Sequence, residues 1–129
     1  MIFKREHCKP VSKPSAERLG KELARVKSSF ASLTRNDGAY VQVAGGPGLF
    51  LLEYRDDAGH YRASQGKPVA CHPDGTTLEC SAGSITMAQA DWFLRNQVAE
   101  VLSAFASGLA WPKYVRWNSR HEPQRANDV

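Results

Sequence analysis

Long apolar runs and cysteines are scarce in this chain of 129 residues, and each scarcity argues against a class of protein. No stretch approaches the roughly 20 apolar residues of a membrane-spanning helix. The first ten residues, MIFKREHCKP, carry charges from residue 4 onward and hold no apolar run typical of a signal peptide. Cys8, Cys71 and Cys80 form an odd and irregular set, which favours a reducing compartment over a disulfide framework. We therefore expect a cytoplasmic protein.

Acidic residues are few at the start of the chain, although the whole sequence has a net charge of only +4. Residues 1–35 hold nine Lys or Arg against three Asp or Glu, a local +6, so the remaining 94 residues carry 4 − 6 = −2. Aromatic side chains that could stack on bases are missing from this basic segment, apart from Phe3 and Phe30. The pattern favours a solvated basic helix face, and we do not expect a nucleic-acid partner.

The chain divides into three parts. Residues 1–13 mix charge with Pro10 and predict a flexible basic arm. A single α+β domain is expected over 14–118, followed by a disordered polar tail at 119–129. The domain should open with a helix over 14–33, because apolar residues recur there at steps of three and four. These residues are Leu19, Leu23, Val26, Phe30 and Leu33.

Three strand-like runs follow this helix, at 39–44, 49–56 and 60–65, and the short polar turn between the last two predicts an antiparallel hairpin. A second hairpin is expected over 68–80. A helix should begin at Thr86 or Asp91 and end at Ser107-Gly108, and a closing strand should follow at 111–117. This order predicts a mostly antiparallel sheet of five to six strands with an N-terminal and a C-terminal helix packed on one face.

A nucleotide site is poorly supported, although Gly45-Gly46-Pro47-Gly48 is rich in glycine. A phosphate-binding loop leads from a strand into a helix, whereas this loop joins two predicted strands. Proline also removes a backbone donor that a phosphate would need. The loop is expected only to turn the chain, and no cofactor is predicted.

Metal ligands and catalytic groups are equally sparse. Cys71 and His72 are adjacent, so on a strand they would point to opposite faces, and no CxxC or HxxxH motif accompanies them. His60 has no carboxylate companion that the sequence places beside it. We therefore predict no metal site and no enzyme, and the alternative is a small enzyme or ligand-binding domain that uses Cys71 and His72.

The remaining candidates belong to a surface for a protein partner. If the helices cover one face of the sheet, Ser64 and Gln65 should lie on the other face with charged neighbours from the same hairpin. The nearby acids would favour a basic partner, and an exposed tryptophan would serve as an aromatic anchor. The candidate partner-binding residues are Glu53, Arg55, Asp56, Asp57, Arg62, Asp74, Glu79 and Trp111.

Two segments resemble a known family. The first is DWFLRNQVAEVLSAFASGLAWPKYVRWN, residues 91–118, and the second is DGAYVQVAGGPGLFLLEYRDDAGHYRAS, residues 37–64. Together they are similar to small immunity proteins of bacterial polymorphic toxin systems. The resemblance implies a non-enzymatic protein that binds a cognate toxin and blocks it. A self-associating structural domain, pairing through a strand at 113–117, is a further alternative.

Overall fold

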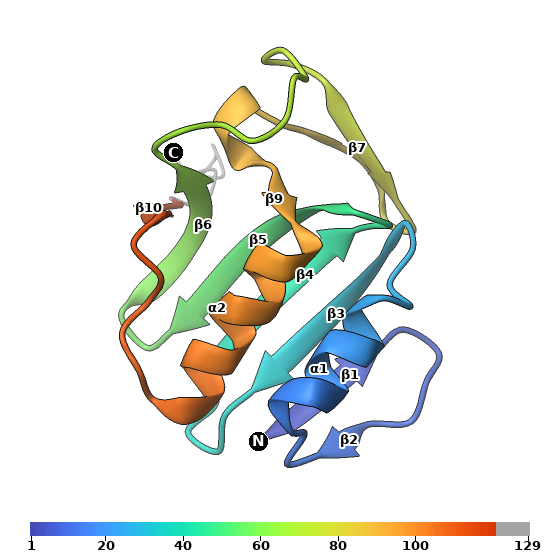
Figure 1. Cartoon of the computed structure of the whole chain (residues 1–129), viewed down its shortest axis with the longest axis vertical. Helices are drawn as coiled ribbons and strands as arrows, with labels where there is room; N and C mark the ends of the chain where they lie inside the picture. Colours follow the sequence, from blue (N-terminus) through green and yellow to red (C-terminus); the bar gives the residue numbers. More distant parts are fainter. Residues whose placement is uncertain (121–129) are drawn as a thin grey trace, which may run out of the picture.

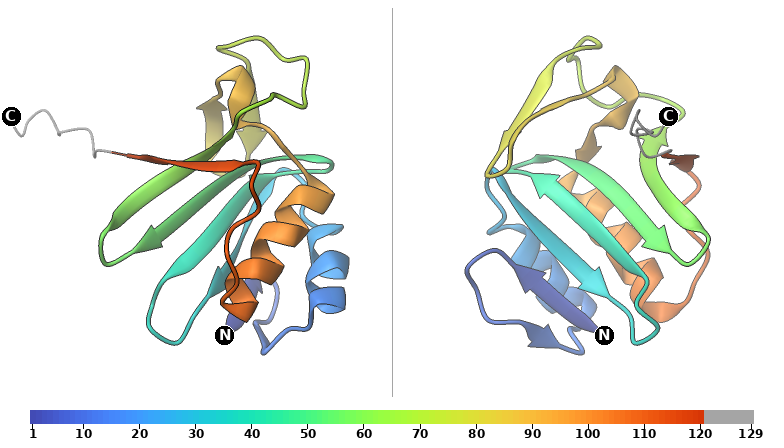
Figure 2. Two further views of the ribbon diagram at one scale, coloured as in Figure 1. Left: turned by 60° about the vertical axis from the view of Figure 1, so that its left-hand side comes forward. Right: turned by 180° about the vertical axis from the view of Figure 1, so that it is seen from behind.

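Eight strands form the main sheet, and two helices pack against one of its faces (Figures 1 and 2). This computed structural model describes residues 1–120. The strands run in the order β10-β6-β5-β4-β3-β1-β2, with β9 paired to one end of β5. The sheet contains β1 (Ile2–Arg5), β2 (Val11–Ser12), β3 (Ser29–Thr34), β4 (Tyr40–Gly45), β5 (Leu49–Asp56), β6 (Gly59–Gln65), β9 (Phe93–Leu94) and β10 (Val115–Ser119). The α+β class and the antiparallel pairing are confirmed, but the sheet has more strands than expected.

The central hairpins follow the prediction closely. The predicted strands at 39–44, 49–56 and 60–65 correspond to β4, β5 and β6. Cross-strand registers place Gln42 opposite Glu53, and Glu53 opposite Arg62. Val41, Val43 and Leu52 are buried on the core side of these strands, and a slip by one residue would turn every side chain to the wrong face.

The helix predicted over 14–33 is wrong in its second half. Helix α1 (Ala16–Leu23) ends early, and the chain then reverses through Ser28, which has a positive φ of 49°. Residues Ser29–Thr34 form β3, paired with both β1 and β4. The apolar residues between 26 and 33 fit a helical spacing by coincidence, and pairing with two neighbouring strands satisfies the backbone instead.

The expected flexible arm at 1–13 is also a misassignment. Its residues form β1 and β2, and β1 pairs with β3 over four residues. Phe3 points from β1 into the core and is buried. Of the tail expected at 119–129, Ser119 closes β10, and the part from 121 onward lies outside the described residues.

The second hairpin forms later in the chain than expected. Strand β7 (Thr77–Cys80) pairs with β8 (Gly83–Thr86) across a turn at Ser81-Ala82, whereas residues 68–71 form no strand. Thr86 therefore ends a strand and does not begin a helix. A short 3-10 turn, η1 (Gln89–Asp91), and β9 precede helix α2 (Arg95–Ser107). The predicted end of α2 is confirmed, because Gly108 adopts the left-handed conformation there.

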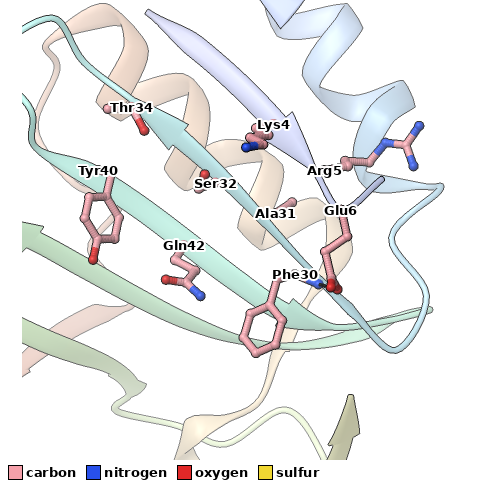
Figure 3. Close-up of a pocket in the computed structure, with 9 residues that line it drawn as sticks. All are labelled: Lys4, Arg5, Glu6, Phe30, Ala31, Ser32, Thr34, Tyr40 and Gln42. Carbon is pink, nitrogen blue, oxygen red and sulfur yellow. Dashed lines mark hydrogen bonds between the residues drawn. The ribbon is translucent and has the colours of Figure 1, made fainter. Parts of the chain in front are cut away.

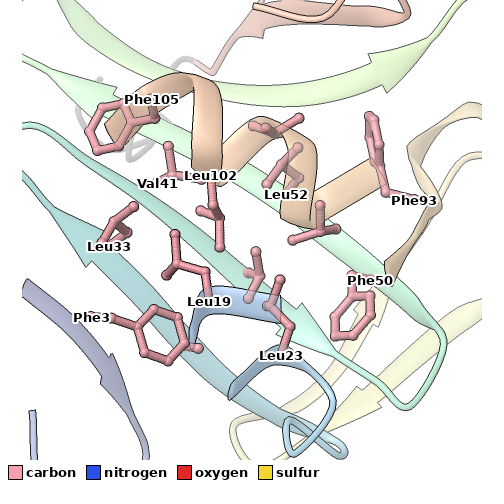
Figure 4. Close-up of a cluster of buried hydrophobic side chains, with 14 of the residues drawn as sticks. Phe3, Leu19, Leu23, Leu33, Val41, Phe50, Leu52, Phe93, Leu102 and Phe105 are labelled. Atoms are coloured by element: carbon pink, nitrogen blue, oxygen red, sulfur yellow. The ribbon is translucent and has the colours of Figure 1, made fainter. Parts of the chain in front are cut away.

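The main core lies between the sheet and the two helices (Figure 4). Leucines from α1 and α2 meet the inward side chains of β1, β3, β4 and β5, so the helices cover this face of the central strands. Its members include Phe3, Leu19, Leu23, Leu33, Val41, Phe50, Leu52, Phe93, Leu102 and Phe105. Neither helix within residues 1–120 has the length and apolar character needed to cross a membrane.

A smaller core lies on the opposite face, at one end of the sheet. There the β7–β8 hairpin and the segment after it cover Ala44 of β4 and Leu51 of β5 with Leu78, Met87 and Trp92. The rest of that face has no helix over it (Figure 2). The fold therefore leaves a broad area of sheet uncovered.

Candidate functional site

The uncovered area, here called the open face, consists of side chains that point away from the helices. It crosses β1, β3, β4, β5, β6 and β10, whose opposite faces hold the main core. Its members are mostly polar or charged, as expected for a sheet face in contact with water. They are Ile2, Lys4, Phe30, Ser32, Thr34, Tyr40, Gln42, Glu53, Arg55, His60, Arg62, Ser64, Arg116 and Asn118.

Four of the five residues expected on this face lie there: Glu53, Arg55, Arg62 and Ser64. Gln65 does not. It points toward α2 and is only 4% exposed. Its side chain donates to the Trp92 carbonyl oxygen at 2.7 Å and exchanges hydrogen bonds with Gln97. Adjacent strand residues alternate between faces, so Ser64 and Gln65 could not share one.

Glu53 is the centre of a charged network on the open face. Arg62 donates from Nε to its carboxylate at 3.2 Å, and His60 Nε2 lies 3.3 Å from the other carboxylate oxygen. Arg120 Nη1 approaches at 3.7 Å, and Arg62 also faces Asp91 at 3.9 Å. The inference that His60 has no carboxylate companion is therefore wrong. Cross-strand neighbours supply one, because Glu53 and His60 belong to the two strands of one hairpin.

Beside this network the open face is hollowed (Figure 3). The hollow has a volume of about 350 Å³ and is lined by residues of β1, β3 and β4. The rings of Phe30 and Tyr40 stand at its two ends, with Gln42 between them and Lys4 across from Gln42. A hollow of this size holds one or two side chains of a partner or a small ligand.

Glu6 fixes one rim of the hollow. Its carboxylate accepts hydrogen bonds from the Ser81 hydroxyl at 2.6 Å and from the Phe30 backbone N–H at 2.8 Å. These two bonds, the Ser81 one first, lower the pKa of Glu6 below its ordinary value. The same contacts tie β1 and β3 to the turn of the β7–β8 hairpin.

The acidic candidates do not gather into one patch. Asp56 and Asp57 lie at the β5–β6 turn, at one end of the sheet, whereas Asp74 and Glu79 belong to the region of the β7–β8 hairpin at the other (Figure 1). Three of them accept hydrogen bonds from the chain itself: Asp56 from Tyr54, Ala58 and Gly59, Asp74 from the Gln89 N–H, and Glu79 from Thr77 and Ser84. The sequence-based idea of an acidic surface around the open face is therefore not supported by their positions.

Trp111 lies on the helix side and not on the open face. Its ring packs edge-on against Tyr54 at 5.3 Å and against Trp117 at 5.0 Å, and it stacks with Phe105 at 6.0 Å. This half-buried aromatic cluster closes the core where the chain passes from α2 to β10.

Cys71 and His72 do not meet as a catalytic pair with a third group. The Cys71 thiol is exposed and free, and the His72 ring lies against Trp92 with ring centres 4.8 Å apart. Within residues 1–120 no group of three His, Cys, Asp or Glu side chains is placed to hold a metal ion.

Most other residues of the open face escaped the sequence reasoning, among them Lys4, Phe30 and Tyr40, which line its hollow. Lys4 had been assigned to an arm and Phe30 to a helix, so neither could be placed on a sheet. The alternation Phe30, Ser32, Thr34 against the buried Ala31 and Leu33 was the available signal.

Comparisons with models of protein families and with curated proteins gave no match for this chain. The geometry of the open face therefore carries the functional argument.

Proposed function

We propose that this protein is a non-enzymatic binding module, an immunity protein that neutralises a cognate bacterial toxin by binding and occluding it. The observation that carries the proposal is the open face: an uncovered area of sheet that presents charges, amides and two aromatic rings. Surfaces of this mixed character, with aromatic and Arg anchors, are typical of protein interfaces.

The rigidity of the surface supports the same function. Its side chains stand on strands whose other face is fixed by the main core, and Arg62 and His60 are held by Glu53. A preorganised surface loses little side-chain freedom on binding, which favours the tight complexes that toxin neutralisation requires. Occlusion needs contact over an area and no catalytic group.

The experiment is a mild affinity purification of the tagged full chain from its native cells, with the toxin-bearing neighbouring genes expressed. We expect one partner in near-equal amount, which is lethal when expressed alone and harmless when co-expressed with this chain. A partner that is not toxic, or the absence of any stoichiometric partner, would contradict the proposal.

A matched pair of variants links the result to the open face. Arg55 is exposed there, whereas Arg25 is exposed beside α1 on the opposite side of the sheet. Arg55→Glu should weaken protection in the co-expression assay, and Arg25→Glu should leave it unchanged. If both variants protect the cells equally well, the open face does not take part in toxin neutralisation.

A further inference from the structure

We propose that the open face recognises an acidic surface of the partner protein, and that a side chain of that surface enters the hollow between Phe30 and Tyr40. This inference rests on the proposed function and specifies the chemistry of the partner. It reverses the expectation from the sequence, in which scattered acids favoured a basic partner.

The charge balance of the open face supports an acidic partner. Five cations line it against three carboxylates, counting Arg120 and the rim groups Glu6 and Asp91. Glu53 is matched by Arg62 and Arg120, and Asp91 faces Arg62. In contrast, Lys4, Arg55 and Arg116 are exposed and pair with no carboxylate of the described chain.

These three cations are spread across the face, with Lys4 on β1, Arg55 on β5 and Arg116 on β10. Because they span the sheet from one side to the other, they match an extended acidic surface better than a single anion. Complementary charge of this kind steers association and fixes the orientation of the complex.

The hollow gives the face an anchor. Phe30 and Tyr40 bound it, while Ser32 and Gln42 supply hydrogen-bonding groups inside it (Figure 3). A side chain inserted between the two rings would be partly shielded from water by the partner, which is the setting in which interface residues contribute most to affinity. Lys4 and Glu6 both line the hollow, so an inserted side chain meets one unpaired charge of each sign there, and the preference for an acidic partner comes from the cations spread across the face.

A nucleic acid is the competing polyanion, and the positions of the carboxylates argue against it. Glu6 lines the hollow and pairs with no Lys or Arg within residues 1–120, so a phosphate backbone crossing the sheet there would meet a negative charge. A protein surface can avoid this group, because its own charges are not evenly repeated.

The test uses the partner captured in the preceding experiment, made inactive by mutation, as the binding probe. Association with the full chain is measured by biolayer interferometry at low and high salt. The triple variant Lys4→Glu, Arg55→Glu and Arg116→Glu should associate about tenfold more slowly at low salt. Tyr40→Ala should raise the dissociation rate about tenfold by emptying one wall of the hollow.

The matched control is Arg25→Glu, Lys27→Glu and Lys113→Glu, which changes the net charge equally. These cations are also exposed, but they lie outside the open face, near α1 and after α2. We expect less than about a twofold change in association rate. Circular dichroism of each variant checks that it is folded.

The outcomes separate this inference from the proposed function. If a toxin binds but the open-face triple variant associates like the wild type, or the control variant is slowed as much, the inference is wrong and the immunity function stands. If no toxin is captured, the proposed function falls and the inference with it. A labelled single-stranded RNA is tested in parallel. If the wild type binds it tightly and the open-face triple variant does not, the ligand of the open face is a nucleic acid and the inference of an acidic protein surface is wrong.

Discussion

Arg5 of β1 donates a hydrogen bond of 2.7 Å from Nε to the carboxylate of Glu22 on α1. Arg18 donates to the second oxygen at 2.9 Å, and only 7% of the Glu22 side chain is exposed. The hydrogen bonds from Arg5 and then Arg18 lower the pKa of Glu22 below its ordinary value. This contact joins the first strand to the first helix, so the N-terminal segment belongs to the body of the domain.

Replacing Glu22 by Gln should therefore destabilise the fold. The change removes the negative charge from beside two guanidinium groups, and we expect a loss of about 1–3 kcal/mol in the free energy of unfolding. Urea denaturation at neutral pH measures it. Glu17→Gln is the control: Glu17 is exposed and lies 3.8 Å from Lys21, so its loss should cost less than about 0.5 kcal/mol. Equal effects of the two changes would contradict the importance of the Arg5 contact.

The Glu22 contact should also depend on pH. Because its pKa is lower in the folded than in the unfolded chain, its stabilising effect is complete above the unfolded value of about 4.3 and is lost as the pH falls through the folded value. The difference in unfolding free energy between wild type and Glu22→Gln should therefore shrink below about pH 4. Denaturation series at several pH values test this, and a constant difference down to pH 2 would contradict it.

Truncating a leucine in the core should lower the free energy of unfolding far more than truncating an exposed leucine. Leu23 of α1 is completely buried, whereas Leu109 is 68% exposed. Leu23→Ala should lower the free energy of unfolding by about 2–5 kcal/mol, because it removes apolar contacts and leaves a cavity. Leu109→Ala should change it by less than about 0.5 kcal/mol. A cost for Leu23→Ala no larger than that of the Leu109 control would mean that α1 does not pack on the sheet as described.

The hairpins of the central sheet could be predicted from the sequence because two local signals agree there. Residues 49–56 and 60–65 are strand-like runs, and a turn sequence of Asp56-Asp57-Ala58-Gly59 lies between them. The α+β fold class followed from the order of the predicted helices and strands along the chain. Strand β3 was ambiguous, because Val26, Phe30 and Leu33 continue the helical spacing whereas the alternation from Phe30 to Thr34 fits a strand. Only its pairing with β1 and β4 decides between them.

The sequence could predict which residues of the central hairpin lie on the open face, but it could not predict the net charge of that face. Residues such as Arg55 and Arg62 could be assigned to one face from their spacing alone. Lys4 and Arg116 join them only because β1 and β10 pair into the same sheet, which depends on contacts distant in sequence. The partnership of Glu53 with Arg120 is of the same kind. Local sequence patterns therefore predict the residues at the middle of the open face. The cations at its edges can be placed only when the pairing of β1 and β10 with the sheet is known.

The loop at 45–48 depends on Gly46 for a reason that can be tested. Gly46 has a φ of 82°, and a Cβ there would overlap the carbonyl oxygen of Val26. Gly38 has a similar φ of 93° but open space around it. Gly38→Ala should cost about 1 kcal/mol for backbone strain alone, and Gly46→Ala should cost about 1–3 kcal/mol more for the overlap. Thermal and urea unfolding of the two variants test the difference, and equal costs would contradict the close approach of Val26.

Replacing the neighbouring acids Asp56 and Asp57 one at a time should distinguish a role in folding stability from a role in binding. Asp56 accepts hydrogen bonds from the Tyr54 hydroxyl at 2.8 Å and from the Ala58 N–H at 2.9 Å. Asp57 is exposed, and its side chain accepts none within residues 1–120. Asp56→Ala should therefore destabilise the fold by about 1–2 kcal/mol, whereas Asp57→Ala should be neutral.

The same pair tests whether these acids steer the partner. If recognition depends on the cations of the open face, Asp57→Ala should leave the association rate unchanged or raise it slightly, because it removes a negative charge near a face that attracts acids. Association measured at low salt against the inactivated toxin decides this. A clear slowing by Asp57→Ala, with stability intact, would show that the turn meets a basic surface of the partner, and the orientation inferred from Lys4, Arg55 and Arg116 would be wrong.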